Sequence, residues 1–212
     1  VMGLAHSPRI VTDGLVLCLD AASKRSYPGT GTVWTDRSAN GYTGTLTNGP
    51  TFNSANGGSV VFDGSDDYVD CGNPSISTGK LTTSAWVKIN TTKFQHVLDS
   101  SSNSWHLAIL DSNRPYLYNG STYGGGAQVL SNLNWYMITG VQGITLDMYV
   151  NGVLSQSVAS NVNVSTNSLH IGRWQAGGRN FDGDIASAQI YNRALTADEI
   201  LQNYLSTKER YA

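Results

Sequence analysis

The sequence predicts an all-β protein built as a two-sheet antiparallel β-sandwich with one short C-terminal helix. The chain has 212 residues, which is enough for one large β-domain with a sizeable core. Short apolar or alternating runs recur along it, and turns rich in Gly 23, Ser 24 and Asn 18 separate them. Only the C-terminal segment combines helical periodicity with a helix start signal.

The front of the chain predicts few strands. An apolar run at residues 14–20 follows a Thr-Asp-Gly turn signal and is expected to form a strand buried on both faces. Turn residues crowd the stretch from 21 to 56, where only Thr43 to Leu46 is expected to be extended.

The middle of the chain is rich in strand signals. Residues 59–63 and 67–71 flank Gly64-Ser65-Asp66, which predicts two strands joined by a tight connection. Strict alternation predicts a strand at 81–89. Asn151-Gly152 predicts a type I′ hairpin turn. Further strands are expected at residues 94–98, 105–110, 115–118, 135–142, 145–150, 168–172 and 185–191.

The helix is expected to begin after Thr196. Glu199 follows three residues later and completes a capping box, in which each side chain satisfies a free backbone N–H. Four apolar residues beyond the cap are expected to share one face and to pack against the edge or end of the sandwich; they are Ile200, Leu201, Tyr204 and Leu205.

Composition excludes several classes of function. Lys+Arg 13 and Asp+Glu 15 nearly balance, and only 13% of the residues are charged, so we expect no nucleic-acid partner and no anionic membrane partner. No segment resembles a membrane span or a signal peptide. Residues 1–12 are expected to form an N-terminal arm, and residues 13–212 one domain.

The cysteines Cys18 and Cys71 are too few for a disulfide framework or a zinc site. Either a single bridge joins their strands, or both are buried thiols.

Several segments occur in a characteristic order. They are Phe62-Asp63-Gly64, Tyr68-Val69, Ser84-Ala85-Trp86-Val87-Lys88, Asn151-Gly152, and Ile190-Tyr191-Asn192-Arg193-Ala194-Leu195 with Glu199-Ile200. This set, which runs from about Gly14 to Leu205, resembles the laminin-G-like, concanavalin-A-like jelly rolls. The resemblance implies a jelly-roll fold but no particular ligand, since one fold carries many functions.

The front segment of the chain resembles one particular subgroup of these jelly rolls. Thr12-Asp13-Gly14-Leu15-Val16-Leu17, with Leu19-Asp20-Ala21-Ala22 and Ser26-Tyr27-Pro28-Gly29, is similar to a subgroup common in virion proteins of tailed phages. This similarity implies a displayed, non-enzymatic module on capsid decorations, tail fibres or related appendages.

Glycoside hydrolysis on this type of jelly roll needs two carboxylates, usually glutamates, on one strand. The only glutamates here are Glu199 and Glu209, in or after the helix, so we expect no enzyme. His96 and His106 stand beside apolar strand residues and are expected to be hydrogen-bonded histidines of a sheet.

Calcium is the one metal to consider. Asp36 and Asn40 lie in a turn-rich loop and, with Asp20, could supply hard oxygen ligands. Many laminin-G-like domains have an equivalent loop, and some bind calcium. This chain departs from that pattern, with Ala39 in place of a glycine and Ala186 in place of an aspartate. The alternative is an Asx-type turn.

Exposed aromatic rings give the sharpest functional hypothesis, because sugars stack their C–H faces on flat rings. Tyr116 and Tyr118 alternate with Leu117, so both rings face one side of their strand. The alternative is that the rings fill the core and Leu117 faces outward. The candidate ligand-binding residues are Trp105, Tyr116, Tyr118, Tyr123 and Trp174.

These observations favour a non-catalytic, surface-displayed module of a virion or cell surface that mediates adhesion, with glycans as partners. The second hypothesis is a structural decoration or assembly subunit whose only partners are other virion proteins. The third, ranked last because the glutamate pair is missing, is a glycoside hydrolase or lyase. A homo-oligomer or a large apolar patch would favour the second. The first two hypotheses place the protein on a virion surface or outside the cell.

Overall fold

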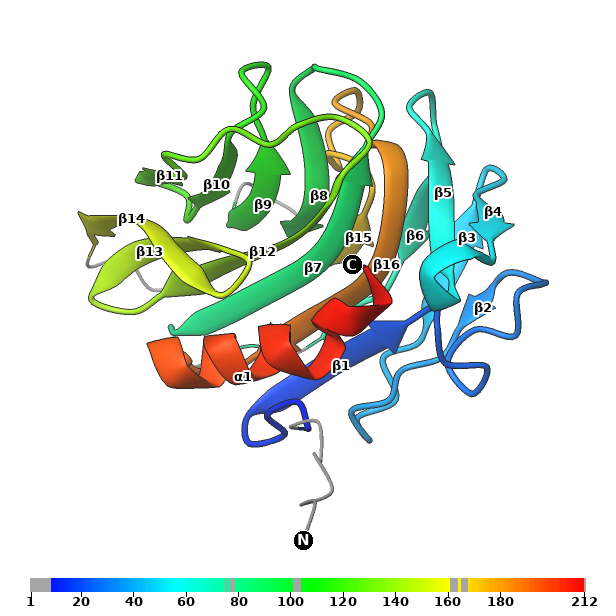
Figure 1. The fold of residues 1–212 in the computed structure, drawn as a ribbon, viewed down its shortest axis with the longest axis horizontal. Helices are drawn as coiled ribbons and strands as arrows, with labels where there is room; N and C mark the ends of the chain where they lie inside the picture. The colour runs from blue at the N-terminus through cyan, green and yellow to red at the C-terminus, as the bar shows by residue number, and fades with distance from the viewer. Residues whose placement is uncertain are drawn as a thin grey trace, which may run out of the picture.

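The structure is a computed structural model that describes residues 9–74, 76, 79–100, 104–160, 164 and 168–211. Two antiparallel sheets stack face to face, and one helix near the C-terminus lies across the outside of one of them (Figure 1). The predicted β-sandwich with a single short C-terminal α-helix is therefore confirmed.

The first sheet is the one that carries the helix. Its strands, in spatial order, are β14 (Val153–Ala159), β13 (Thr145–Val150), β12 (Trp135–Gln142), β7 (Leu81–Ile89), β16 (Asp182–Tyr191), β5 (Ser59–Asp63) and β4 (Thr51–Asn53), with β1 (Leu15–Asp20) also paired to β16.

The second sheet lies behind the first. Its strands, in spatial order, are β11 (Tyr123–Gly125), β10 (Pro115–Tyr118), β9 (Trp105–Ile109), β8 (Gln95–Ser100), β15 (Leu169–Ile171), β6 (Tyr68–Asp70), β3 (Gly44–Thr47) and β2 (Val33–Trp34). The helical segments are α1 (Ala197–Thr207) and two short 3₁₀ turns, η1 (Ala55–Gly57) and η2 (Lys208–Arg210).

The main hydrophobic core lies between the two sheets. The alternation predicted for β7 holds, because Leu81, Ala85, Val87 and Ile89 all enter this core. The first strand, β1, is buried along its middle, as predicted. Cys18 and Cys71 are both buried and free, and burial raises the pKa of the Cys18 thiol to about 12.

A second, smaller core lies between the first sheet and α1. Trp86, on the outer face of β7, packs there with Ile200 and stacks on Tyr204 at 5.7 Å between ring centroids. The helix therefore covers the outer face of the sheet rather than its edge or end. Leu201 is correspondingly exposed, and its predicted place on the buried face is taken by Asn203.

The end of the expected N-terminal arm is packed rather than free. Val11 is buried in the second core, and its backbone N–H donates to Asn203 Oδ1 at 2.8 Å. Residues 1–8 of the expected arm lie outside the described residues.

The capping box at the start of α1 is confirmed, with Glu199 N donating to Thr196 Oγ1 and Thr196 N donating to Glu199 Oε2. Asn151 and Gly152 have φ values of 51° and 79° and form the predicted tight turn between β13 and β14. No helix in the described ranges is both long and apolar enough to cross a bilayer.

The connection at Gly64-Ser65-Asp66 differs from a hairpin. β5 pairs with β4 and β16 in the first sheet, whereas β6 pairs with β3 and β15 in the second. β5 and β6 are inner strands of different sheets, so the short connection passes from one sheet to the other at the ends of these strands. Sequence patterns predict strands and turns here but not which sheet each strand joins.

Candidate functional site

A pocket of about 410 Å³ opens on the outward face of the second sheet, within the size range of small-ligand sites. Aromatic rings dominate its wall, and one arginine joins them. The lining residues are Phe94, His106, Leu110, Tyr116, Tyr118, Tyr123, Trp174 and Arg179. Four of the five predicted ligand-binding residues therefore meet in one place.

Strand alternation explains which side chains face this pocket. On β10, Leu117 points inward, because its side chain lies 3.0 Å from where a Cβ on Gly140 of the opposite sheet would be. Tyr116 and Tyr118 consequently face outward. Across the sheet, His106 of β9 is opposite Tyr118, and Tyr118 is opposite Tyr123 of β11, so these side chains form one cross-strand row.

Trp105 is an exception among the predicted residues. It precedes His106 on β9, so its side chain points to the other face, where it is 0% exposed within the main core. A ring in that position cannot contact a ligand. Trp105 therefore stabilises the sandwich, and the pocket has four of the expected rings instead of five.

A β-bulge in β8 brings two further polar residues to the same face. His96 is opposite Ala108, but Leu98 is opposite Leu107, so Val97 is an extra residue on β8. Asp99, three residues after His96, then lies opposite His106. Without the bulge, His96 and Asp99 would point to opposite faces of the sheet.

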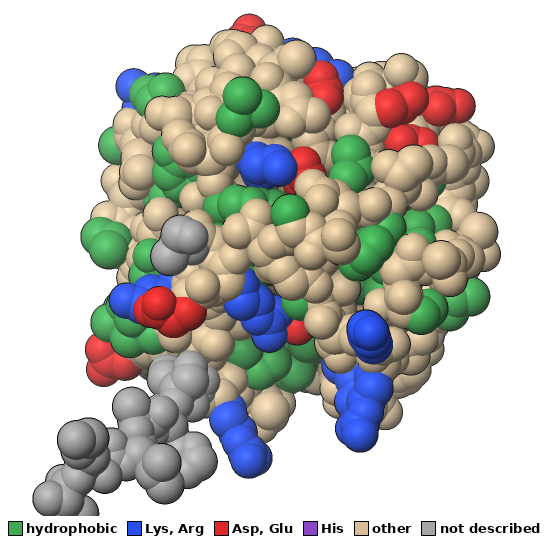
Figure 2. Space-filling model, turned by 45° about the vertical axis from the view of Figure 1, so that its right-hand side comes forward, with side chains coloured by type: hydrophobic (Ala, Val, Ile, Leu, Met, Phe, Trp, Pro, Cys, Tyr) green, Lys and Arg blue, Asp and Glu red, His purple; other side chains and the backbone are tan. Residues whose placement is uncertain are grey.

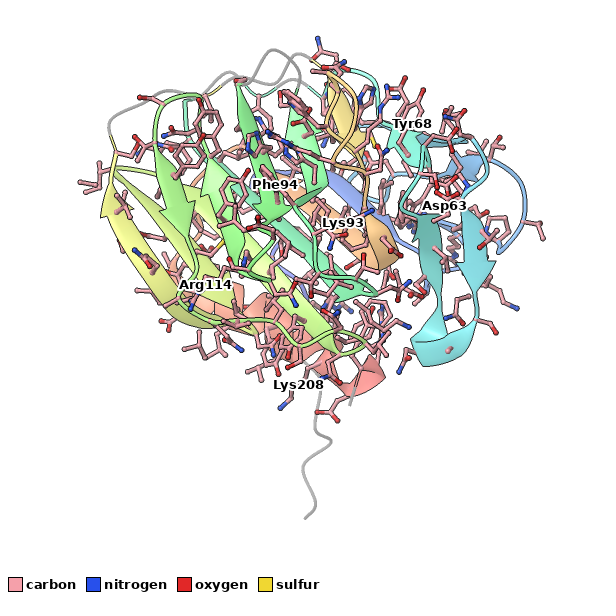
Figure 3. The ribbon with its side chains drawn as sticks, turned by 90° about the horizontal axis from the view of Figure 1, so that it is seen from above. Asp63, Tyr68, Lys93, Phe94, Arg114 and Lys208 are labelled. Atoms are coloured by element: carbon pink, nitrogen blue, oxygen red, sulfur yellow. The ribbon has the colours of Figure 1, made fainter. Side chains whose placement is uncertain are left out.

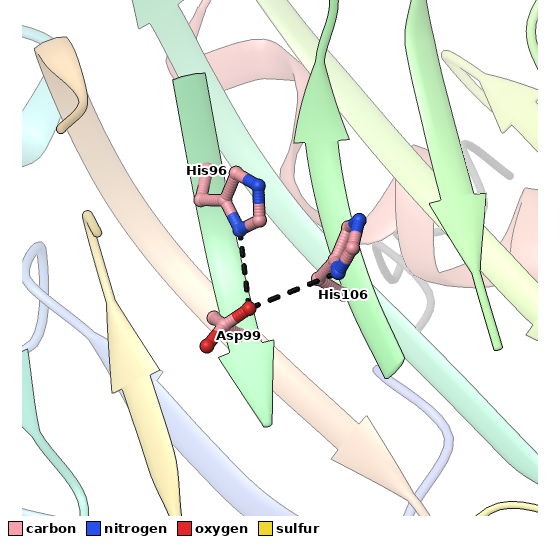
Figure 4. A group of neighbouring side chains, drawn as sticks. All are labelled: His96, Asp99 and His106. Carbon is pink, nitrogen blue, oxygen red and sulfur yellow. Dashed lines mark hydrogen bonds and ion pairs between the residues drawn. The ribbon is translucent and has the colours of Figure 1, made fainter. Parts of the chain in front are cut away.

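Next to the pocket, and sharing its lining residue His106, lies a buried cluster of His96, Asp99 and His106, called the floor below (Figure 4). Asp99 Oδ1 lies 3.1 Å from His96 Nδ1 and 3.8 Å from His106 Nδ1. His106 Nε2 lies 2.8 Å from the hydroxyl of Tyr116. All four residues are less than 5% exposed, with His106 the most exposed of them at 4%.

Burial sets the charges of this floor. Desolvation lowers the pKa of His96 and of His106 to about 3 each, so both imidazoles are neutral at pH 7. Desolvation also raises the pKa of Asp99 to about 6, while the Gln175 backbone N–H opposes this shift. At neutral pH the floor thus holds one carboxylate and two neutral imidazoles.

The loop between β15 and β16 forms one wall. Its ends are pinned by backbone hydrogen bonds from Phe181 to Gly172 and from His96 to Arg179. Arg179 is exposed, and its guanidinium stacks 4.1 Å from the centroid of Phe94 and 4.4 Å from that of Trp174. The positively charged guanidinium of Arg179 therefore lies against two aromatic rings at the rim of the pocket.

The segment before β8 forms the adjacent wall. Lys93 Nζ donates to the carbonyl of Gly64 at 3.1 Å, which ties this segment to the turn that also holds Asp63 (Figure 3). Phe94, the next residue, lines the pocket, with its ring centroid 5.8 Å from that of Tyr116. Tertiary contacts thus place Phe94, which sequence patterns alone did not single out.

The carboxylates that glycoside hydrolysis would need can be located relative to the pocket. Neither glutamate is near it: Glu199 caps α1 and forms two hydrogen bonds with Arg193, at 2.8 and 2.7 Å, and Glu209 lies in η2. Asp99 is the one carboxylate at the described floor. The pair of carboxylates that a retaining or inverting glycosidase needs is therefore missing from the described pocket.

The residues considered for calcium are engaged in other contacts. Asp36 accepts hydrogen bonds from the backbone N–H groups of Cys18 and Tyr42 and from Ser38. Asn40 directs its Nδ2 donor toward the carbonyls of Leu15 and Val16.

Asp20 binds Arg210 through both carboxylate oxygens at 3.0 Å. The carboxylates of Asp20 and Asp36 are thus engaged with protein donors, and the Ser38 backbone N–H donates to Asp36 Oδ1 at 2.8 Å. The arrangement is that of the alternative Asx-type turn, and calcium binding stays a prediction.

Much of the surface carries no charge. On the face shown in Figure 2, charged side chains are scattered and uncharged polar groups fill most of the area between them. A second concave region of about 380 Å³ lies near the chain ends and includes Arg9, Arg37 and Arg210. Arg210 is paired there with Asp20 at 3.0 Å, and no aromatic ring is among the described residues that line this region, so the predicted ligand-binding residues are all absent from it.

Comparison with solved structures identifies the same fold in carbohydrate-related proteins. Domain 4 of an extracellular arabinanase from Geobacillus stearothermophilus, in complex with arabinotriose, is 17% identical with a TM-score of 0.71; the match covers 90% of this chain and 98% of that one. The ligand-binding domain of botulinum neurotoxin serotype D, in complex with N-acetylneuraminic acid, is 18% identical with a TM-score of 0.70 and coverages of 92% and 51%.

The sialidase of Trypanosoma rangeli is 14% identical, with a TM-score of 0.70 and coverages of 98% and 36%. This chain thus spans about half of the neurotoxin domain and about a third of the sialidase. At these identities the likeness shows the fold alone.

Sequence comparison gives the family. No curated protein matches the chain. A family model described as the concanavalin A-like lectin/glucanases superfamily matches residues 63–201, which include β7, the β13–β14 turn and the start of α1. With its two-sheet sandwich and its ordered motifs, the chain belongs to the laminin-G-like domains of the concanavalin A-like lectin/glucanase superfamily.

Proposed function

We propose that this protein is a non-catalytic, surface-displayed module that mediates adhesion by binding glycans in the aromatic pocket. One observation carries the proposal: Tyr118, Tyr123 and Trp174 meet in a pocket of about 410 Å³. Tyr123 is 64% exposed, and Tyr118 and Trp174 are half-buried, so ring surface is available to a ligand. Flat rings of this kind bind the C–H faces of sugars.

Arg179 suggests the type of sugar. Its exposed guanidinium has no ion-pair partner among the described residues, and it lies at the rim of the pocket. An acidic sugar would offer a ring to Tyr123 and a carboxylate to Arg179. The first probes are N-acetylneuraminic acid and arabinotriose, because two proteins of the same fold were solved with these ligands.

We place the display on a virion, as a capsid decoration or a part of a tail fibre or related appendage. The support is the similarity of the front segment, residues 12–29, to laminin-G-like domains of tailed-phage virion proteins. A surface with few charges also suits a crowded particle, because neighbouring particles then do not attract each other electrostatically.

The test is binding of the purified chain to a glycan array, followed by calorimetry with each glycan that binds. Tyr123→Ala and Trp174→Ala should each reduce affinity at least about tenfold, because stacking on one ring contributes one to a few kcal/mol. Ile144→Ala is the matched control, because Ile144 is 81% exposed and lies outside the pocket. Unchanged affinity in both pocket variants would contradict the proposal.

A second candidate function is a decoration or assembly subunit that binds only other virion proteins. The observation that favours it is the edge strand β14, which ends the first sheet and contains no charged residue. Val153 and Leu154 on this strand are 67% and 50% exposed. Uncharged edge strands readily pair with another chain.

Light scattering of the wild type and of Leu154→Lys would test this second function. A defined oligomer that becomes a monomer in the variant supports it, whereas a wild-type monomer at all concentrations contradicts self-association through β14.

A further inference from the structure

The buried cluster beside the aromatic pocket brings two imidazoles and one carboxylate together without completing their hydrogen bonds. One ligand atom from each of His96, Asp99 and His106 lies within 4.8 Å of the other two. His106 Nδ1 is buried and has no hydrogen-bond partner within the described part of the chain. At 3.8 Å, its distance to Asp99 Oδ1 is too long for a hydrogen bond.

The contact between His106 and Tyr116 bears on which nitrogen of His106 carries the proton. When Nε2 of His106 donates to the Tyr116 hydroxyl, Nδ1 carries a lone pair that faces the Asp99 carboxylate. Two electron-rich atoms then face each other in a buried site. A cation between them would turn this unfavourable contact into two bonds.

The outer contacts of His106 and Asp99 are those of a metal site, whereas Nε2 of His96 is buried without a hydrogen-bond partner among the described residues. Metal-binding histidines commonly donate their second ring nitrogen to a nearby oxygen, and His106 Nε2 has such an oxygen in Tyr116 at 2.8 Å. The other oxygen of Asp99, Oδ2, accepts from the backbone N–H of Gln175 at 3.1 Å. Asp99 Oδ1 is therefore oriented toward the two imidazoles.

The distances also fit. Two ligand atoms that bind one tetrahedral zinc ion lie about 3.4 Å apart, given bond lengths of about 2.1 Å. The observed separations from Asp99 Oδ1 are 3.1 Å to His96 Nδ1 and 3.8 Å to His106 Nδ1. Small side-chain rotations would bring all three atoms to one ion.

We infer that His96, Asp99 and His106 bind a first-row divalent transition-metal ion through Nδ1, Oδ1 and Nδ1. Imidazole with carboxylate favours zinc, iron or manganese over calcium, which prefers oxygen ligands alone. Three protein ligands leave a further coordination position for a water molecule. The inference rests on these three side chains and does not depend on glycan binding.

Calorimetry with zinc chloride on the metal-free full chain is the first test. Wild type should bind one zinc ion, and Asp99→Asn and His96→Gln should each abolish this binding. Tyr116→Phe, which removes only the outer contact, should weaken binding about tenfold. Calcium chloride should give no binding at the same site.

The matched control is Asp66→Asn. Asp66 belongs to a carboxylate group with the exposed Asp63 and the buried Asp67, which could also attract cations. Zinc affinity should be unchanged in this variant. Zinc binding that survives Asp99→Asn and is lost in Asp66→Asn would overturn the inference.

Cobalt substitution of the wild type gives a readout that needs no variant. A cobalt(II) ion bound by two imidazoles in a four- or five-coordinate site should show visible absorption bands well above those of aqueous cobalt, and zinc should displace it. The spectrum of aqueous cobalt alone, or the absence of any one-to-one complex, would overturn the inference even if the floor variants fail to fold.

Discussion

His106 and Tyr116 lie on neighbouring strands with the imidazole Nε2 2.8 Å from the phenolic oxygen, and both side chains are almost fully buried. Tyr118, two residues further along β10, faces the same side and stacks on His106 with ring centroids 4.9 Å apart. The outward face of one strand thus contributes both a structural ring, Tyr116, and a ring available to ligands, Tyr118. Variants can separate these two roles.

Tyr116→Phe should lower the free energy of unfolding by about 1–3 kcal/mol, because it leaves His106 Nε2 buried without its partner. Denaturant unfolding monitored by circular dichroism measures this change. Tyr123→Phe is the control. Its free energy of unfolding should stay within about 0.5 kcal/mol of the wild-type value, because Tyr123 is 64% exposed. Equal effects of the two variants would show that the His106–Tyr116 contact does not stabilise the fold.

Acid should destabilise the protein from just below pH 6.5. The folded-state pKa values of His96 and His106 are lowered to about 3, so between pH 6.5 and 3 the unfolded chain binds two protons there that the folded chain does not. Asp99, whose pKa is raised to about 6, binds one proton in the folded state between pH 6 and its ordinary value near 3.8. Between pH 6 and 3.8 the unfolded chain therefore binds one proton more than the folded chain at these three residues. The free energy of unfolding then falls by about 1.4 kcal/mol for each pH unit of acidification.

Urea unfolding at a series of pH values tests this sign. In His96→Gln/His106→Gln the two depressed histidines are gone and Asp99 remains. Unfolding free energy should therefore fall less steeply with acid in this variant than in the wild type. Parallel curves would contradict the assignment of neutral, buried imidazoles.

Most strands could be predicted from the sequence because their alternation was strong. β7, β10, β12 and β13 have the predicted bounds, since each combines an alternating or apolar run with clear turn residues on both sides. β2 and β4 were not predicted: they are short and lie in the turn-rich front segment. Trp34, on β2, is nonetheless fully buried, because neighbouring strands supply the contacts that its own segment lacks.

The site was predictable only in part. Alternation around Leu117 correctly identified two tyrosines that share a face, but it could not decide whether that face is the core or the surface. The floor was not predictable, because Val97 is an extra residue in β8 and shifts Asp99 onto the face of His96. A bulge depends on pairing with a partner strand, and one sequence alone does not reveal that pairing.

Asp36→Asn should destabilise the protein by about 1–3 kcal/mol in calcium and in chelator alike. Its carboxylate accepts from the N–H groups of Cys18 and Tyr42, so it acts as an internal anchor of the loop. Thermal unfolding of wild type and variant in both buffers measures this. A calcium-dependent rise in the wild-type midpoint that the variant lacks would instead support the calcium site predicted from the sequence.

Thr196→Ala should lower the free energy of unfolding by about 1 kcal/mol, because the first turn of α1 loses its side-chain acceptor. Glu199→Ala should lower the free energy of unfolding further, since Glu199 closes the capping box and also pairs with Arg193 at 2.7 Å. The helix covers Trp86, whose Nε1 donates to Thr207 at 2.8 Å, so hydrogen exchange in β7 should increase in both variants.

Asp198→Ala is the control for both cap variants, because Asp198 is exposed in the same first turn but takes no part in the capping box. It should retain near wild-type exchange in β7. Increased exchange confined to α1 would show instead that the helix can fray at its start without exposing the sheet beneath it.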